Sequence, residues 1–258
     1  MEIPEVLEIK SIKNENWKTK TFFFDKKIKV EPGQFMMLWI PGLDEKPFSV
    51  SFDSPSGLTI AKVGPFTEKL FQMKEGDKVG LRGPYGHGFE LIGRNICLVS
   101  GGCGCAPILL LAKNAKTKGM NVTSILGAKT KNDLLFVDEM KKYASEIIIT
   151  TDDGSFGKKG FSTEALKELL NKKRFDCVYT CGPEKMMKKV FEICEDSEIM
   201  LQASLDRYMK CGFGVCGQCT IDDIRICKDG PVLDSNQLRK LIEFGVFKRD
   251  KSGMKNYF

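Results

Sequence analysis

Short apolar segments separated by turn residues make up the first 93 residues of this 258-residue chain. The segments are Phe22–Phe24, Phe35–Ile40, Phe48–Phe52, Leu58–Val63 and Lys78–Leu81. Pairs such as Pro32-Gly33 and Pro41-Gly42 lie between them and favour abrupt changes of chain direction. Strands of this length at such regular spacing predict an all-β barrel or sandwich over residues 1–93.

Residues 94–203 alternate between strand-like and helical segments. The expected strands are Ile96–Ser100, Val122–Leu126, Ile147–Thr151, Cys177–Thr180 and Ile199–Ala203. The expected helices are Ala106–Lys118, Leu134–Tyr143, Glu184–Cys194, and one capped by Ser162 or Thr163 that runs through Leu170. This alternation predicts a doubly wound parallel sheet. Residues 204–258 form a third, cysteine-containing domain with one expected helix, Asp234–Phe244.

The overall charge and the N-terminal sequence restrict the class of protein. The net charge is +6, from 40 basic and 34 acidic residues, and the lysines are scattered, which indicates a solvated surface and no nucleic-acid site. The acidic N-terminus does not resemble a signal peptide, and the uncharged run Asn95–Ala112 is short for a membrane span. We therefore expect a cytoplasmic protein, whose ten cysteines serve metal binding or catalysis.

Four cysteines near the C-terminus have the spacing C-x4-C-x2-C-x7-C. They are Cys211, Cys216, Cys219 and Cys227. The first two gaps match the plant-type ferredoxin pattern for a [2Fe–2S] cluster, and Gly212, Gly214 and Gly217 allow the loop to curl around the sulfides. Four thiolates also suffice for a structural zinc ion, so a zinc site is the alternative. His87 is the only histidine, which excludes a two-histidine Rieske centre.

Two turns of the α/β region have the composition of nucleotide-binding loops. Gly101, Gly102, Gly104, Ala106 and Pro107 lie between the first strand and its helix, where glycines admit a pyrophosphate to a helix N-terminus. The intervening Cys103 and Cys105 are too few for a metal site. Cys181, Gly182 and Pro183 follow the fourth strand, so they should face the same crevice. Cys181 either contacts a nicotinamide or is a small buried apolar residue.

Two barrel segments offer the groups that a flavin requires. Lys46-Pro-Phe-Ser49 and Lys62-Val-Gly-Pro-Phe-Thr67 contain cations and hydroxyls for phosphates and backbone groups for a ring edge. By themselves, these residues predict only a strand followed by a turn.

Taken in order, the motifs resemble the ferredoxin–NADP reductase superfamily over nearly the whole chain. The resemblance implies an antiparallel flavin-binding barrel, a nucleotide domain and a small [2Fe–2S] domain. It implies that FAD is bound by Lys46, Pro47, Phe48, Ser49, Lys62, Val63, Gly64, Phe66 and Thr67. The glycine-rich loop and the Cys181 turn would bind NAD. Lys46 stands where the superfamily usually has arginine, which keeps the charge but loses bidentate geometry.

Two C-terminal segments, Ser204–Cys216 and Cys227–Asp234, are similar to the electron-transfer subunits of NAD-linked dihydroorotate dehydrogenases, and so is Thr151–Gly157 with Lys159-Gly160. The resemblance implies a path from dihydroorotate through FMN in a catalytic partner subunit, the cluster and FAD to NAD+, as a step in UMP synthesis. It also implies a heterotetramer with two copies of each subunit. No residue is assigned a catalytic role here, because the base that acts on dihydroorotate is expected in the partner.

Other functions remain open at this point. Lys129 and Lys131, after the second strand, would favour NADP if they met a 2′-phosphate, whereas the resemblance favours NAD. The chain could be a subunit of an NADH-dependent ferredoxin:NADP reductase or a sulfide dehydrogenase, or an oxygenase reductase. A zinc-stabilised binding module without a redox role is the alternative from another class.

Overall fold

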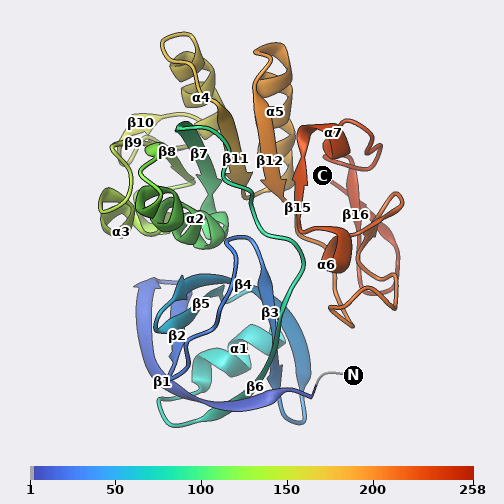
Figure 1. The fold of residues 1–258 in the computed structure, drawn as a ribbon. Helices are drawn as coiled ribbons and strands as arrows, with labels where there is room; N and C mark the ends of the chain where they lie inside the picture. The colour runs from blue at the N-terminus through green and yellow to red at the C-terminus, as the bar shows by residue number, and fades with distance from the viewer. Residues whose placement is uncertain (1–2) are drawn as a thin grey trace.

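The computed structural model describes residues 3–258. In its N-terminal region, six antiparallel strands close into a barrel (Figure 1). The strand order is β1-β2-β5-β4-β3-β6. Their bounds are β1 (Glu5–Asn16), β2 (Thr19–Phe24), β3 (Phe35–Ile40), β4 (Asp44–Asp53), β5 (Ser56–Ala61) and β6 (Lys78–Tyr85). Fully buried side chains such as Phe22, Leu38 and Ile60 fill the interior. The barrel prediction is confirmed.

One helix interrupts the barrel region, where the sequence predicted only a strand and a turn. Helix α1 (Pro65–Gln72) contributes Phe66 and Leu70 to the barrel core. The Thr67 hydroxyl accepts hydrogen bonds from the backbone N–H groups of Val63 (2.8 Å) and Gly64 (3.1 Å). Proline at the first helical position and a capping side chain two residues later are helix-start signals, which the expectation of an all-β region overlooked.

A seven-stranded sheet forms the second region, in the order β10-β9-β8-β7-β11-β12-β15. The parallel strands are β7 (Asn95–Gly101), β8 (Asn121–Ala128), β9 (Glu146–Thr151), β10 (Lys158–Lys159), β11 (Cys177–Cys181) and β12 (Met200–Ser204). The helices are α2 (Cys105–Thr117), α3 (Val137–Lys141), α4 (Ser162–Leu170) and α5 (Glu184–Asp196), with short turns η1 (Gly102–Gly104) and η2 (Lys131–Asp133). Figure 1 shows the helices on both sides of the sheet.

The alternation of side chains along β7 explains why the sheet is covered on both faces. Cys97 and Val99 pack in one core with residues of α4 and α5, whereas Ile96 and Leu98 pack in another with residues of α2 and α3. Because successive residues of a strand point to opposite faces, an entirely apolar strand requires cover on both. The predicted doubly wound sheet is confirmed.

Two predicted helices are much shorter in the structure. The segment Leu134–Tyr143 contains only the five-residue α3, because Phe136 adopts a left-handed conformation with φ 58° immediately before it. The segment Asp234–Phe244 contains only α7 (Ser235–Leu238), and Asp234 ends strand β15. In both segments some apolar residues have helical spacing in the sequence but lie in turns, and their side chains are buried from there.

The C-terminal region is built from small elements that attach to the sheet. They are β13 (Thr220–Ile221), β14 (Ile224–Arg225), α6 (Ile226–Asp229), β15 (Val232–Asp234), α7, β16 (Phe247–Arg249) and β17 (Lys255–Tyr257). Strand β15 pairs antiparallel with β12, so residues beyond 204 supply the edge of the nucleotide sheet. The domain boundaries 1–93, 94–203 and 204–258 stay a prediction. Among residues 3–258, none of the helices has the length and apolar character of a membrane span.

The linker between barrel and sheet is held by a buried tyrosine. The Tyr179 hydroxyl donates to the Glu90 carbonyl (2.9 Å) and accepts from the Ile92 N–H (2.8 Å). The Tyr179 side chain is fully buried, and the Phe89 ring meets it edge-on at 5.8 Å. One hydroxyl thus satisfies two backbone groups of the segment that joins the two large regions.

Replacing this tyrosine tests the role of that hydroxyl. We expect Tyr179→Phe to lower the free energy of unfolding by about 1–3 kcal/mol, because the Ile92 N–H loses its acceptor and the Glu90 carbonyl keeps only its second donor, Gln202. Denaturant titration at matched cofactor content measures the change. The control is Tyr143→Phe, at a half-buried tyrosine after α3. Equal stability of the two variants would contradict the assignment.

Candidate functional site

A cavity of about 380 Å³ lies where the barrel, the sheet and the C-terminal region meet, and we call it the inner cleft. Pro47 and Ser49 of β4 line it from the barrel side. The predicted nucleotide residues that line it are Gly101, Gly102, Gly104, Pro107, Cys181, Gly182 and Pro183. The inner cleft therefore brings residues of the predicted flavin and nicotinamide motifs together.

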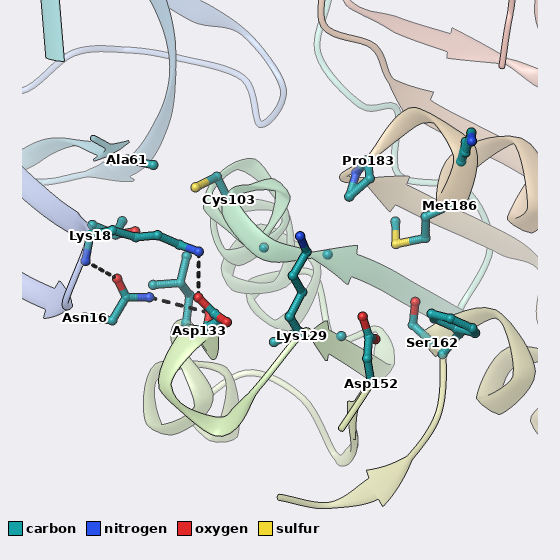
Figure 2. Close-up of a pocket in the computed structure, with 18 of the residues that line it drawn as sticks. Asn16, Lys18, Ala61, Cys103, Lys129, Asp133, Asp152, Ser162, Pro183 and Met186 are labelled. Carbon is teal, nitrogen blue, oxygen red and sulfur yellow. Dashed lines mark hydrogen bonds and ion pairs between the residues drawn. The ribbon is translucent and has the colours of Figure 1, made fainter. Parts of the chain in front are cut away.

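A second cavity, of about 640 Å³, lies between the barrel and the carboxyl ends of β7, β8 and β9. We call it the outer cleft, and it shares Gly101, Gly102, Cys103 and Pro183 with the inner one. Figure 2 shows Lys129, Asp152 and Ser162 on the sheet side and Lys18 and Asn16 on the barrel side. Ligands of open α/β sheets bind at this end of the strands, so the two clefts together can take an extended dinucleotide.

The two nucleotide turns touch each other directly at Gly104. A Cβ atom on Gly104 would lie 2.1 Å from the carbonyl oxygen of Cys181, so only glycine permits this approach. The glycine-rich sequence predicts a close approach of the backbone at this turn. It does not predict which residue approaches, because Cys181 lies at the end of another strand, β11.

The predicted flavin residues divide between the clefts and the wall behind them. Phe48 stacks on Phe66 at 6.1 Å within the barrel, and the hydroxyl of Thr67 is engaged in the turn before α1. Val63 lines the outer cleft, and Lys62 is exposed outside both clefts. Of these residues, Pro47, Ser49 and Val63 face the cavities, and the assignments of all of them to FAD stay predictions.

Lys46 lies close to the segment that leads to the four cysteines. Its ammonium pairs with Asp44 and sits 5.3 Å from the centre of the Tyr208 ring. The cation of the predicted flavin motif therefore contacts an aromatic residue between β12 and Cys211. Gly64 directly precedes α1, whereas Ala106 is buried in α2, and neither residue lines a cleft.

Cys181 is half-buried at the end of β11, and its surroundings keep the thiol neutral. Burial raises the pKa of Cys181 to about 12, which outweighs the opposite effect of a hydrogen bond with Ser204. A thiol with this pKa is not a nucleophile at neutral pH. Its position in the inner cleft suits contact with a ring and not covalent chemistry.

The four C-terminal cysteines lie together as two pairs, Cys211 with Cys216 and Cys219 with Cys227. The Cys227 sulfur accepts a hydrogen bond from the Gly214 N–H (3.1 Å), and the Cys219 sulfur accepts one from the Cys227 N–H (3.4 Å). None of the ten cysteines, all of which lie within the described residues, forms a disulfide.

Hydrogen bonds prepare two of these thiols for metal binding. Burial raises the pKa of Cys211, but the backbone N–H groups of Cys216, Phe213 and Val215 outweigh it and lower the pKa to about 6. The hydrogen bond from the Cys227 thiol lowers the pKa of Cys219 to about 7 and raises that of Cys227. Thiolates are the metal-binding form of cysteine, so the loop favours a cationic metal group.

The paired arrangement fits a two-iron cluster better than a single zinc ion. A structural zinc ion needs four ligands around one centre, whereas a [2Fe–2S] cluster takes two thiolates on each iron. The donor set and the N–H groups directed at sulfur therefore fit the cluster.

Several residues of the clefts were not predicted from the sequence. Phe35, Ser204, Asp206 and Met209 line the inner cleft. Ser204 ends β12 and Asp206 follows it, so the rule that located Cys181 at the end of a parallel strand would also have found them. Lys18 and Asn16 come from the hairpin between β1 and β2, and no sequence signal indicates that this hairpin faces the sheet.

A buried ion pair fixes the segment between β12 and the cysteines. Arg207 donates to both carboxylate oxygens of Glu184 at the start of α5, and the Gly245 N–H donates to the same carboxylate (3.0 Å). The two charged side chains are 2% and 6% exposed. Because a buried charge without its partner is costly, this segment is held in one position against the sheet.

Comparisons with known proteins agree with this geometry. A family model described as the iron-sulfur cluster binding domain of dihydroorotate dehydrogenase B matches residues 206–239, and an oxidoreductase NAD-binding domain matches residues 98–192. The chain is 51% identical to a probable dihydroorotate dehydrogenase B (NAD(+)), electron transfer subunit, from Methanocaldococcus jannaschii, over 100% of both chains. A protein of the same name from Methanothermobacter thermautotrophicus is 46% identical, over 98% of this chain and 97% of that one.

Solved structures show the same fold. The structure of an NADH-dependent reduced ferredoxin-NADP oxidoreductase matches with a TM-score of 0.84 and 30% identity, over 95% of this chain and 94% of that chain. A cytochrome P450 reductase from Amycolatopsis matches with a TM-score of 0.66 and 22% identity, over 76% of this chain and 67% of that chain.

Removing one thiol tests the paired arrangement. We expect Cys219→Ser to abolish cluster assembly, since one iron loses a ligand, and to leave FAD binding and some NADH oxidation by an artificial two-electron acceptor. Iron analysis and the visible spectrum measure the first effect, and steady-state assays the second. Cys103→Ser, at an exposed cysteine outside the four, is the control for iron content. Retention of both irons in Cys219→Ser would rule the arrangement out.

Proposed function

This chain belongs to the family of electron transfer subunits of dihydroorotate dehydrogenase B, and we propose that it carries electrons from a catalytic partner to NAD+. The route we propose runs from the partner's flavin through a [2Fe–2S] cluster and FAD in this chain. The observation that supports it is the meeting of three motifs at the inner cleft. Ser49 of the flavin motif, Cys181 of the nucleotide turn and Met209, just before the first cluster cysteine, all line it.

Each cofactor has a distinct set of residues. Cys211, Cys216, Cys219 and Cys227 would hold the two irons. Pro47 and Ser49 would orient the flavin from the barrel side, opposite the nicotinamide turn. When bound, FAD supplies the chemistry that couples hydride exchange with NAD to one-electron exchange with the cluster.

The walls of the inner cleft favour transfer of electrons over side reactions. Phe35, Leu205 and Met209 are buried and present apolar surface to the cavity, which excludes water from the reacting rings. The neutral thiol of Cys181 would position the nicotinamide without forming a bond to it. The Cys181–Gly104 contact holds the two nucleotide loops at one separation.

The partner would be an FMN-containing catalytic subunit that oxidises dihydroorotate in UMP synthesis, with two copies of each subunit in the complex. We propose that it docks over the loop Cys211–Cys216. Val215 is 77% exposed and Phe213 39% exposed on this loop, and Cys216 is exposed. Exposed apolar side chains beside a redox group suit a contact through which an electron must leave.

The outer cleft supports NAD as the nucleotide. Lys129 and Asp152, at the ends of β8 and β9, both line this cavity. Burial raises the pKa of Asp152, and nearby Lys129 opposes that effect. A carboxylate here would accept a hydrogen bond from a ribose 2′-hydroxyl and repel a 2′-phosphate, whereas Lys129 alone would attract the phosphate.

A second candidate function is a subunit of an NADH-dependent ferredoxin:NADP reductase. The TM-score of 0.84 to such an enzyme favours it as the alternative. Isolation of the native complex separates the two. An FMN-containing partner that oxidises dihydroorotate supports our proposal, whereas a larger partner with additional clusters supports the alternative.

The proposed function has a direct test in the purified complex. We expect one FAD and two irons for each copy of this chain, an EPR signal on reduction, and NAD+ reduction by dihydroorotate only when both subunits are present. A colourless protein that contains zinc would contradict the proposal.

A change at Asp152 tests the choice of nucleotide. We expect Asp152→Ser to raise the ratio of kcat/KM for NADPH to that for NADH by about tenfold or more, because the repulsion of the 2′-phosphate is removed. The control is Asp153→Ser, since Asp153 does not line the outer cleft and bonds to Ser155 instead. An unchanged ratio in Asp152→Ser would show that this carboxylate does not select the nucleotide.

A further inference from the structure

Arg82, near the end of β6, is a buried cation that the proposed function does not yet use. Its side chain is 8% exposed, and it donates from Nε and Nη2 to the two carboxylate oxygens of Glu45 on β4. Its Nη1 donates to the Tyr85 hydroxyl (3.1 Å). Because Glu45 balances the charge, the guanidinium acts mainly through its shape and position.

The same guanidinium lies against two aromatic rings. Its central carbon is 5.4 Å from the centre of the Tyr85 ring and 5.6 Å from that of Phe213. Tyr85 belongs to the barrel, but Phe213 belongs to the loop Cys211–Cys216, which would hold the cluster. Arg82 thus joins the barrel to the cluster loop through a planar group that contacts an aromatic ring of each.

A second contact holds the loop against the same wall. Gly212 has φ +80°, and a Cβ there would lie 2.9 Å from Cγ of Met37 and 3.5 Å from Cδ2 of Tyr85. Phe35, which lines the inner cleft, has its ring centre 5.9 Å from that of Tyr85. Tyr85 therefore packs between Phe35 of the inner cleft and the loop Cys211–Cys216, which we call the cluster loop. Both Arg82 and Gly212 lie against Tyr85.

One strand connects the two redox sites. Glu45, the partner of Arg82, lies on β4, two residues before Pro47 and four before Ser49. Strand β4, which carries the predicted flavin residues, is therefore linked to Phe213 by two contacts: Glu45 binds Arg82, and Arg82 lies against the Phe213 ring. A shift of the cluster loop away from the barrel would break the ring contact between Phe213 and Arg82.

We propose that Arg82 is a positioning residue that clamps the cluster loop to the barrel wall and sets the separation between the flavin site and the cluster. The inference rests on the proposed function for its consequence, which is efficient transfer between the two groups. The clamp itself is a property of the protein chain. Phe213 is 39% exposed, so the ring has room to leave the barrel once the guanidinium is gone.

Two variants test the clamp from its two sides in the complete, cofactor-loaded protein. Arg82→Met removes the guanidinium, and Phe213→Leu keeps apolar bulk but removes the ring. The matched control is Arg239→Met, because Arg239 also donates to both oxygens of a carboxylate, Glu195, at a distant exposed site.

Hydrogen–deuterium exchange is the primary measurement, since it reads the loop without depending on activity. We expect the backbone amides of residues 212–217 to exchange about tenfold faster in both variants, the factor expected when a cation–π clamp on a locally opening segment is lost. FAD content, iron content and the rate of flavin reduction by NADH should match the unaltered protein. Arrival of electrons at the cluster, followed by rapid mixing and freezing for EPR, should be slower in both variants only.

The outcomes separate the clamp from the proposed function. Unaltered loop exchange in Phe213→Leu and Arg82→Met overturns the clamp, and faster exchange with an unchanged rate of cluster reduction overturns its role in setting the separation between flavin site and cluster. If Arg82→Met loses FAD or iron, it has misfolded, and Phe213→Leu alone decides. If NADH does not reduce the flavin of the unaltered protein, the proposed function fails, and loop exchange still decides whether Arg82 clamps the loop.

Discussion

The antiparallel pairing of β12 with β15 is the contact on which the redox part of the molecule depends. Ser204 pairs with Val232, and the Leu205 N–H donates to the Pro231 carbonyl (2.9 Å), so the intervening segment is closed into a loop. Cys211 follows β12 and Cys227 precedes β15, and this closure therefore brings the first and last cluster cysteines together. The same strand covers the edge of the nucleotide sheet, which would otherwise expose unpaired backbone groups. The loop that carries the four cysteines is thus attached to the nucleotide sheet through backbone hydrogen bonds at both of its ends.

Two ion pairs hold the loop that this pairing closes, and the arginine of each is buried. Arg207 binds Glu184 on the sheet side, and Arg82 binds Glu45 on the barrel side. Buried pairs contribute little net stability, because the desolvation of two charges opposes their attraction, but a displaced partner leaves an unpaired charge and is strongly disfavoured. Their effect is therefore on position. In a protein that must keep a flavin, a nicotinamide and a cluster at constant separations, position matters more than additional stability.

Most of the chemistry could be predicted from local sequence, and most of the errors arose where distant contacts decide the outcome. The cysteine spacing, the glycine-rich turn at Gly101 and the turn at Cys181 are local patterns, and they indicated the correct family. The helix predicted over Leu134–Tyr143 was too long because Phe136 takes a left-handed conformation and packs against Phe52 of the barrel. Asp234–Phe244 was expected to be a helix, but Asp234 ends β15, where it pairs with Gln202 of β12, and only Ser235–Leu238 is helical. In both segments an apolar pattern at helical spacing is satisfied by burial in a turn.

The sequence by itself determined the alternation of strands and helices in the nucleotide domain and the spacing of the four C-terminal cysteines, and it predicted which loops would meet a dinucleotide. These features depend on residue types a few positions apart, whose chemistry acts through short stretches of backbone. Only the tertiary structure decided that Lys18 faces the outer cleft, that Gly104 touches Cys181 and that Arg82 contacts Phe213. Each of these contacts joins residues far apart in the chain, and it exists because the barrel and the sheet bury their apolar faces in one particular arrangement. Local composition permits many such contacts, and close packing selects the few that occur.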